Sequence, residues 1–138
     1  MEYVTSCGFV PYREVGGERQ YLIIHSRNGD CGFPKGHMEP GETEHETAIR
    51  ELKEETNMEV RIIDGFRRQI EYPLPHRENV MKRSVYFLGK CADGTLVCQE
   101  CEVAAALFVP FEEALEALTF EETKEILRDA EEFLSSSN

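Results

Sequence analysis

"GHMEPGETEHETAIRELKEETNM", residues 36 to 58, predicts a helix that carries a high density of negative charge. Thr43 and Glu46 match the pattern of a capping box, and a proline-glycine turn precedes them, so the helix is expected to begin near Thr43. Asn57 is expected to end it, because asparagine accepts the left-handed conformation that helix ends often need. The stretch therefore predicts a well-delimited acidic helix.

Three carboxylates in this helix, Glu51, Glu54 and Glu55, follow the i, i+3, i+4 spacing at which like charges are neighbours and repel. They border a side predicted to be buried, formed by Ala48, Ile49, Leu52 and Thr56. A solvated charged surface is the usual role of a glutamate-rich helix. At the edge of a cleft, however, such carboxylates raise one another's pKa unless a cation is present. Hard divalent ions prefer oxygen ligands, so the pattern indicates a metal site.

Composition sets limits on the rest of the molecule. A chain of 138 residues with 41% hydrophobic side chains fits one domain, residues 1–138, which can bury its own core. The net charge of −12 repels nucleic acids and anionic membranes, so neither is an expected partner. The sequence has no apolar run long enough for a membrane span and no basic start typical of a secretory signal. We expect a cytoplasmic protein.

The five cysteines are dispersed and odd in number, which favours reduced thiols over a disulfide framework. Cys98 and Cys101 form a C-x-x-C pair that could indicate redox chemistry or half of a zinc site. A structural zinc ion usually has four ligands, and only Cys91 is near in sequence, so ordinary small side chains are the favoured interpretation.

The remaining pattern is that of an α/β protein. Strands are predicted at residues 3–12, 20–26, 58–72 and 82–91, with a glycine turn between the first two and a break at Gly65 in the third. The apolar run 104–111 is predicted to be buried. Helices are predicted at 112–118 and 120–134, before a flexible tail at 135–138. The buried face of the last helix is predicted to comprise Phe120, Ile126, Leu127, Ala130, Phe133 and Leu134.

The acidic helix and the loop before it resemble the signature box of the Nudix hydrolases, G-x5-E-x7-R-E-U-x-E-E-x-G-U, where U is aliphatic. Gly36, Glu42 and residues 50–58 match it, with Asn57 in place of the last glycine. Both residue types accept positive φ. The resemblance implies an α/β/α sandwich with a mixed central sheet and a loop-helix-loop box. It also implies cleavage of a nucleoside diphosphate linked to another moiety, with Mg²⁺ or Mn²⁺.

The resemblance implies a role for each matching residue. Arg50 and Glu42 would brace the loop-helix-loop, and Arg50 is also placed to hold a carboxylate by a charge-assisted bond. Glu55 and Glu102 are the two candidates for the general base. The implied metal ligands are the Gly36 carbonyl and the carboxylates of Glu51, Glu54 and Glu55.

Beyond the box, "CGFVPYRE", "YLIIHS", "FPKGHMEPGE", "IIDGFRRQIEY" and "KRSVYFL" are similar to the asymmetrical diadenosine tetraphosphate hydrolases. This likeness implies that diadenosine tetraphosphate, a small-molecule nucleotide, is cleaved to ATP and AMP. It also implies that Lys35 and Lys82 contact polyphosphate and that Tyr72 and Tyr86 lie near the nucleotide, where an aromatic face can stack on a base.

Three other functions stay open from the sequence. Pro73 lies sixteen residues after Asn57, close to the spacing associated with ADP-ribose pyrophosphatases. RNA 5′ ends present a similar linkage, although the acidic net charge disfavours them. A nucleotide-sensing module without turnover would keep the fold, but it would have no need for the complete set of Arg50, Glu51, Glu54 and Glu55.

Overall fold

The computed structural model describes residues 2–94, 96–97 and 103–136. Within these ranges, seven strands form one sheet in which β3, β2, β1, β6 and β5 are consecutive neighbours, while β4 also pairs with β1 and β7 with β2. The strands are β1 (Glu2–Val15), β2 (Glu18–Ser26), β3 (Cys31–Gly32), β4 (Lys35–His37), β5 (Val60–Pro73), β6 (Val80–Cys91) and β7 (Val103–Pro110). The helices are α1 (Glu44–Thr56), α2 (Phe111–Ala117) and α3 (Glu121–Ser136).

The sheet is mixed, as the sequence predicted. β1 runs parallel to β6 and antiparallel to β2 and β4, and β5 runs antiparallel to β6. Gly16 and Gly17 turn the β1–β2 hairpin with φ of 59° and 82°, values that favour glycine. The predicted break at Gly65 is also present, since its φ is 94° and the β5–β6 register shifts between Ile63 and Arg67.

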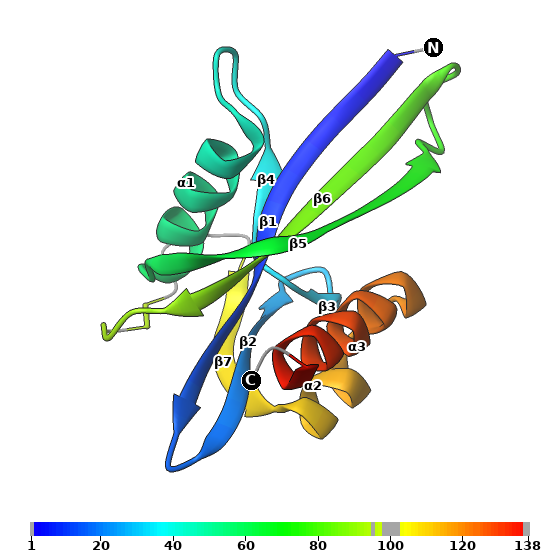
Figure 1. The fold of residues 1–138 in the computed structure, drawn as a ribbon. Helices are drawn as coiled ribbons and strands as arrows, with labels where there is room; N and C mark the ends of the chain where they lie inside the picture. The colour runs from blue at the N-terminus through cyan, green and yellow to red at the C-terminus, as the bar shows by residue number, and fades with distance from the viewer. Residues whose placement is uncertain (1, 95, 98–102, 137–138) are drawn as a thin grey trace.

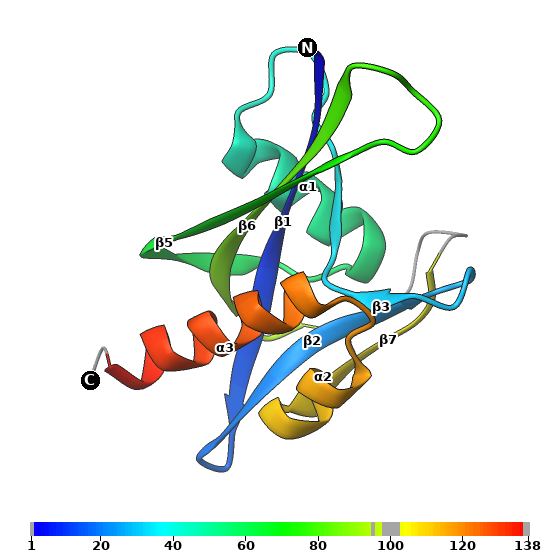
Figure 2. The same ribbon diagram turned by 90° about the vertical axis from the view of Figure 1, so that its right-hand side faces the viewer.

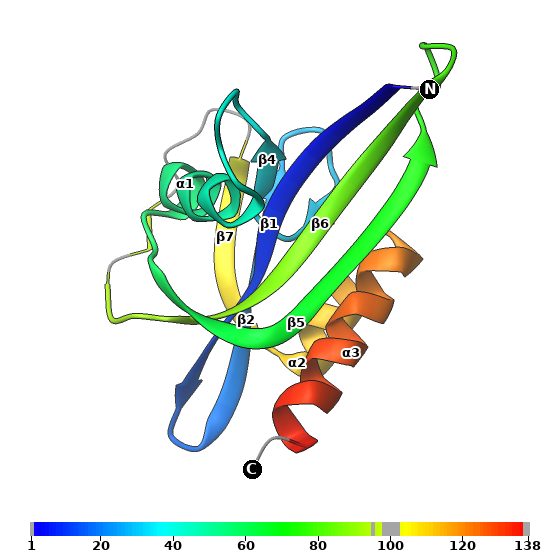
Figure 3. The ribbon, with the colours of Figure 1, turned by 45° about the horizontal axis from the view of Figure 1, so that its top comes forward.

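Helices cover both faces of the sheet, which confirms the predicted α/β architecture. Figures 1 and 3 show α1 on one side of β1, β6 and β5, and α3 on the other. Figure 2 shows α3 crossing the sheet with α2 beside it. Alternate strand residues supply the two cores, because successive side chains point to opposite faces. Val85 belongs to the same core as Leu52 of α1, whereas Tyr86 belongs to the same core as Leu127 of α3.

The structure corrects four details of the predicted pattern. Ile49 is 45% exposed and Phe120 53% exposed, so neither belongs to a buried face. The strand β7 is less buried than its composition suggested, with Leu107 36% exposed. Residues 135 and 136 belong to α3 and not to a tail.

The described helices also bear on membrane association. None of them combines the length and the apolar composition that a membrane-spanning helix requires.

Candidate functional site

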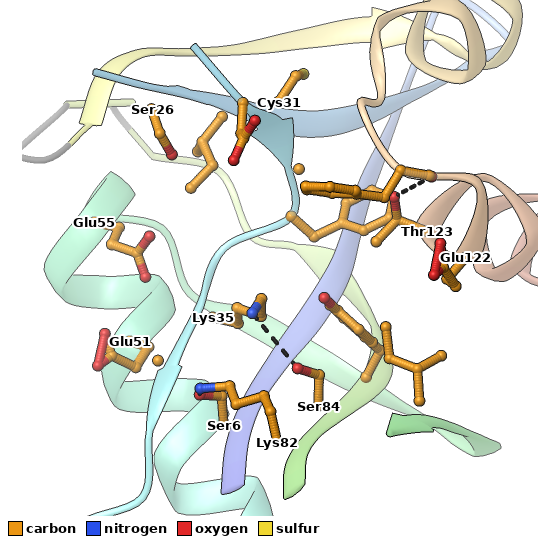
Figure 4. A pocket seen from close by; sticks show the side chains of 18 of the residues that line it. Ser6, Ser26, Cys31, Lys35, Glu51, Glu55, Lys82, Ser84, Glu122 and Thr123 are labelled. Atoms are coloured by element: carbon orange, nitrogen blue, oxygen red, sulfur yellow. Dashed lines mark hydrogen bonds between the residues drawn. The ribbon is translucent and has the colours of Figure 1, made fainter. Parts of the chain in front are cut away.

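The site lies where β1 changes its partner. β1 pairs with β4 over residues 6–8 and with β2 over residues 12–15, so the sheet divides between these two stretches. A cavity of about 920 Å³ opens there. Figure 4 shows Glu51 and Glu55 entering from α1, Lys35 and Lys82 lying near them, and Thr123 at the start of α3. The divided sheet thus allows helices on opposite faces to contribute to one cavity.

Most of the predicted site residues meet in this cavity. Eight of them line it: Lys35, Gly36, Glu51, Glu54, Glu55, Tyr72, Lys82 and Tyr86. Glu42, Arg50 and Asn57 are not among the lining residues and act on the surrounding framework. Glu102, Cys98 and Cys101 fall outside the described residues, so the predicted roles of Glu102 and of the cysteine pair stay predictions.

The ends of α1 are fixed as the sequence predicted. Thr43 and Glu46 form a reciprocal capping box, in which Glu46 N–H donates to Thr43 Oγ1 at 3.1 Å and Thr43 N–H donates to Glu46 Oε1 at 2.8 Å. Asn57 has a φ of 67° and ends the helix in the left-handed conformation. Both caps satisfy backbone groups that a helix end leaves unpaired, so α1 begins and ends at defined residues. The packing of Ala48 and Leu52 in the core sets which side of α1 faces the sheet.

Arg50 holds the loop and the helix together. Its Nε and Nη2 donate to the two carboxylate oxygens of Glu42 at 2.6 and 3.0 Å, the bidentate geometry that arginine favours. Its Nη1 donates to Glu51 at 3.1 Å and to Glu54 at 3.0 Å. Nη2 also donates to the carbonyl of His37 at 2.9 Å. Arg50 therefore connects β4, the following loop and two glutamates of α1.

Glu42 illustrates the strength of this network. Hydrogen bonds from the Arg50 guanidinium, and then from the backbone N–H of Glu39, lower the pKa of Glu42 to about 2. A further bond from Thr47 Oγ1 at 2.9 Å has the same effect. The carboxylate is consequently ionised throughout the physiological pH range.

Gly36 makes room for the carboxylate of Glu51. A Cβ atom at this position would come within 2.0 Å of Cδ of Glu51, so the Glu51 carboxylate lies directly against the glycine backbone. Any other residue would displace this carboxylate. The requirement is steric, because real Cβ atoms do not approach other atoms this closely.

The cationic wall of the cavity is formed by Lys35 and Lys82. Lys82 is only 7% exposed, and burial, with a contribution from the nearby Lys35, lowers its pKa to about 8. Burial also lowers the pKa of Lys35, against the opposing effect of Glu55. The pKa of His37 is lowered too, by burial and by both lysines. The wall therefore holds positive charge that the fold itself only weakly compensates.

The aromatic residues separate into a buried and an exposed group. Tyr86 is 1% exposed and packs edge-on against Phe33, with ring centroids 6.1 Å apart. Burial raises the pKa of its hydroxyl. Tyr72 is 41% exposed and Phe120 53% exposed, and both line the cavity. These two rings are the more accessible surfaces for a nucleobase.

Several lining residues were not identified as site residues from the sequence, and Ser6, Ser84 and Phe120 are among them. Ser84 was detectable in principle, because Lys82, Ser84 and Tyr86 alternate along one strand and must share a face, whereas Ser6 joins them only through the β1–β6 register. Phe120 was assigned to the core because its position fits the apolar side of α3. It precedes the first residue of that helix and so does not follow the helical periodicity.

The donor set fits a divalent cation in its chemistry. Three carboxylates and a backbone carbonyl are oxygen donors of the kind that Mg²⁺ and Mn²⁺ prefer. Within the described ranges, however, no three acidic, imidazole or thiol groups converge closely enough to hold an ion as they stand. Arg50 accounts for part of this, because it already binds Glu51 and Glu54. Side-chain rotation would be needed to assemble the ligands.

The sequence and the fold of this chain are similar to those of known proteins. A family model described as the NUDIX domain matches residues 6–130. The asymmetrical bis(5′-nucleosyl)-tetraphosphatase of Mus musculus is 36% identical over 97% of this chain and 97% of its own length. The protein of the same name from Rattus norvegicus is 34% identical over 86% of this chain and 82% of its own length. A crystal structure of a C. elegans Ap4A hydrolase binary complex superposes with a TM-score of 0.87 and 27% identity, covering 96% of this chain and 98% of that one.

Proposed function

The chain belongs to the NUDIX family, and from this premise we propose that it cleaves dinucleoside tetraphosphates asymmetrically, giving ATP and AMP from diadenosine tetraphosphate. The observation that carries the proposal is the composition of the cavity, in which Glu51, Glu54 and Glu55 face Lys35 and Lys82 beside exposed aromatic rings. The near full-length similarity to the mouse enzyme supports the choice of substrate.

The acidic side of the cavity is assigned to a divalent ion. Glu51, Glu54 and Glu55, with the Gly36 carbonyl, would hold one or more Mg²⁺ or Mn²⁺ ions, in agreement with the general requirement of the family's hydrolases for divalent metals. When bound, such an ion neutralises polyphosphate charge and makes a water molecule more acidic. Arg50 and Glu42 would fix the direction of the ligands from behind.

The basic side is assigned to the polyphosphate. Lys35 and Lys82 present ammonium groups to the cavity, and each can donate to phosphate oxygens. Tyr72 and Phe120 would lie against the base, since both are exposed and sequence-independent stacking requires only an accessible aromatic face. Tyr86 would support this surface from below through its contact with Phe33.

The general base is assigned to one of two glutamates. Glu55 is 7% exposed and lines the cavity, so it is near the reacting groups and largely shielded from solvent. Glu102 is the alternative. The Glu55→Gln and Glu102→Gln variants separate them, because loss of the base removes the acidic limb of the pH–rate profile.

The test is a product analysis. Purified protein with Mg²⁺ is assayed on diadenosine polyphosphates, ADP-ribose, nucleoside triphosphates, sugar nucleotides and 5′-triphosphorylated RNA, with ¹⁸O-labelled water to locate the attacked phosphorus. We expect diadenosine tetraphosphate to give ATP and AMP at the highest kcat/KM. Two molecules of ADP, or preferred turnover of another substrate, would contradict the proposal.

Two alternatives are decided by the same panel. The proline spacing that suggested ADP-ribose has an ordinary structural reason, because Pro73 is the last residue of β5. Preferential cleavage of ADP-ribose would nevertheless restore that alternative. Binding of nucleotides without turnover of any of them would identify a sensing module.

A further inference from the structure

Two serines stand beside each other in the floor of the cavity. Ser6 of β1 lies opposite Ser84 of β6, and the same row continues to Ile70 of β5 and to His37 of β4. Alternate residues of a strand share a face, so Lys82 projects on the same side as Ser84. The two hydroxyl groups and the two lysines therefore lie on one wall, as Figure 4 shows.

Each lysine reaches the serine of another strand. Nζ of Lys82, on β6, donates to Oγ of Ser6, on β1, at 2.6 Å. Nζ of Lys35, on β4, lies 3.5 Å from Oγ of Ser84, on β6, which is a longer and weaker contact. Ser6 is 1% exposed and Ser84 is fully buried. The contacts cross the three strands and fix where the ammonium groups lie.

A serine hydroxyl orients an ammonium group without neutralising it. Among the described residues, neither Lys35 nor Lys82 belongs to an ion pair, whereas most of the other cationic side chains of the sheet and of α1 do. An ammonium group has three N–H donors. Lys82 directs one to Ser6, and its Nζ also lies 3.0 Å from Nε2 of His37. At least one donor is left for a ligand.

The backbone makes room for this arrangement at Gly8. A Cβ atom there would lie 2.1 Å from the carbonyl oxygen of Pro34 and 2.6 Å from Cβ of Lys35. Gly8 is the β1 residue directly opposite Lys35. The close approach of β4 to β1, which brings Lys35 over the serine row, depends on the missing side chain.

We propose that Ser6 and Ser84 are positioning residues for the substrate polyphosphate: they hold Lys82 and Lys35 as oriented cations that, among the described residues, belong to no ion pair. The inference rests on the proposed function, in which these lysines contact polyphosphate. Ser6 has the larger effect because its contact is the shorter one. Neither serine has to touch the reacting atoms.

The first experiment measures binding without hydrolysis. Inorganic tripolyphosphate is titrated calorimetrically into the full chain in EDTA, and thermal unfolding of every variant is recorded. We expect Ser6→Ala to weaken binding by roughly 10- to 150-fold, the range for loss of one hydrogen bond to a charged group, and Ser84→Ala to weaken it less. The unfolding curves show whether each variant is folded.

A double-mutant cycle shows whether Ser6 acts through Lys82. In a Lys82→Met background, Ser6→Ala is expected to have no further effect on tripolyphosphate binding, because the group that it orients is gone. In a Lys35→Met background, Ser6→Ala is expected to keep its full effect. The second background is the matched control, since it removes a cation of the same wall that Ser6 does not hold.

Ser6→Asp tests whether Ser6 must be uncharged, in addition to accepting a hydrogen bond from Lys82. Ser6→Asp keeps an acceptor for Lys82 but adds a negative charge, so we expect it to weaken tripolyphosphate binding more than Ser6→Ala does. Retained binding by Ser6→Asp would overturn the proposal. So would equal effects of Ser6→Ala in both methionine backgrounds, or no tripolyphosphate binding by the wild type. The turnover panel tests the proposed function separately, because binding in EDTA does not depend on hydrolysis.

Discussion

Arg50 and Lys82 are two cations at one cavity, and the fold treats them differently. Arg50 is surrounded by acceptors that carry charge: both oxygens of Glu42, Glu51 and Glu54. Lys82 has a hydroxyl and an imidazole as its neighbours. The arginine is neutralised within the structure, so it stabilises the framework. Among the described residues the lysine has no carboxylate partner, which agrees with the proposed contact between Lys82 and polyphosphate.

The pKa values of the two cations shift in opposite directions for this reason. The hydrogen bond to Glu42 raises the pKa of Arg50, whereas burial lowers that of Lys82 to about 8. Charged partners compensate the loss of hydration for Arg50, whereas Lys82 has, within the described part of the chain, only an uncharged hydroxyl and a nearby imidazole. Substitution of Arg50 should therefore lower the stability of the protein, whereas substitution of the buried Lys82 should raise it.

The largest effect is expected on the acidic side of the cavity that Arg50 organises. Glu55→Gln keeps the size of the side chain but removes a negative charge that no neighbouring group can replace. We expect kcat to fall by about 10³-fold or more, as for loss of a metal ligand or general base. Steady-state kinetics with Mg²⁺ measures this.

Glu125→Gln is the matched control for that change. Glu125 is an exposed residue of α3, so its substitution should leave kcat unchanged. A Glu55→Gln variant with wild-type kcat would show that this carboxylate has no part in the reaction.

The next effect concerns Arg50 itself. Arg50→Lys keeps the charge but loses the bidentate contact with Glu42 and the simultaneous contacts with Glu51 and Glu54. We expect kcat/KM to fall about 10- to 100-fold, the range for residues that support metal ligands, together with a lower Tm. Calorimetric titration of Mn²⁺ would show weaker binding.

Arg128→Lys serves as the control, since the Arg128–Glu121 pair is exposed on α3. It should change neither kcat/KM nor Tm appreciably. Equal behaviour of the two lysine variants would remove the structural role assigned to Arg50.

Lys82→Met is expected to stabilise the protein, whereas Arg50→Lys destabilises it. KM for the nucleotide should rise about 10-fold, while the protein becomes more stable by about 1 kcal/mol at pH 7 because a buried, uncompensated charge is removed. In the unfolded chain lysine keeps its proton to higher pH, so the wild type regains this stability as pH rises above the folded pKa of about 8. The advantage of the variant should therefore shrink between pH 8 and 10.

Thermal unfolding at pH 7 and pH 9.5 measures that trend. A Lys82→Met variant that is less stable than the wild type at pH 7 would show that Lys82 contributes to the fold as Arg50 does.

The smallest effect is expected for Glu42→Gln. The pKa of Glu42 is lowered to about 2 in the folded protein, so its contribution to stability is present above the ordinary pKa of a glutamate and is lost as pH falls through 2. We expect Tm to fall by no more than about 3 °C near neutral pH, since glutamine keeps an acceptor for Arg50, and Arg50 keeps Glu51 and Glu54 as charged partners. The Tm values of the wild type and of Glu42→Gln should become equal near pH 2. A difference that persists there would assign the effect to something other than the charge.

Local patterns allowed the sequence to predict much of the site. The capping box at Thr43, the left-handed Asn57 and the glutamate spacing depend on neighbours a few residues apart, and each is present in the structure. Ile49 was misassigned because helical periodicity gives only the direction of a side chain, and Phe120 because it precedes the first residue of α3. Helical periodicity does not show whether another element covers that direction. Ile49 and Phe120 are both exposed, because no other described element covers them.

By itself, the sequence determined the acidic helix, its ends, the Arg50 motif and the mixed α/β arrangement, because hydrogen bonding and periodicity within one segment specify them. Only the tertiary structure decided that Lys82 meets Ser6, 76 residues away, and that Gly8 lets β4 approach β1. Those contacts depend on strand register and on the division of the sheet, which arise from pairing between distant segments. The physical reason is that the hydrogen-bond partners of a side chain on one strand, such as Lys82, lie on strands that are distant in the sequence.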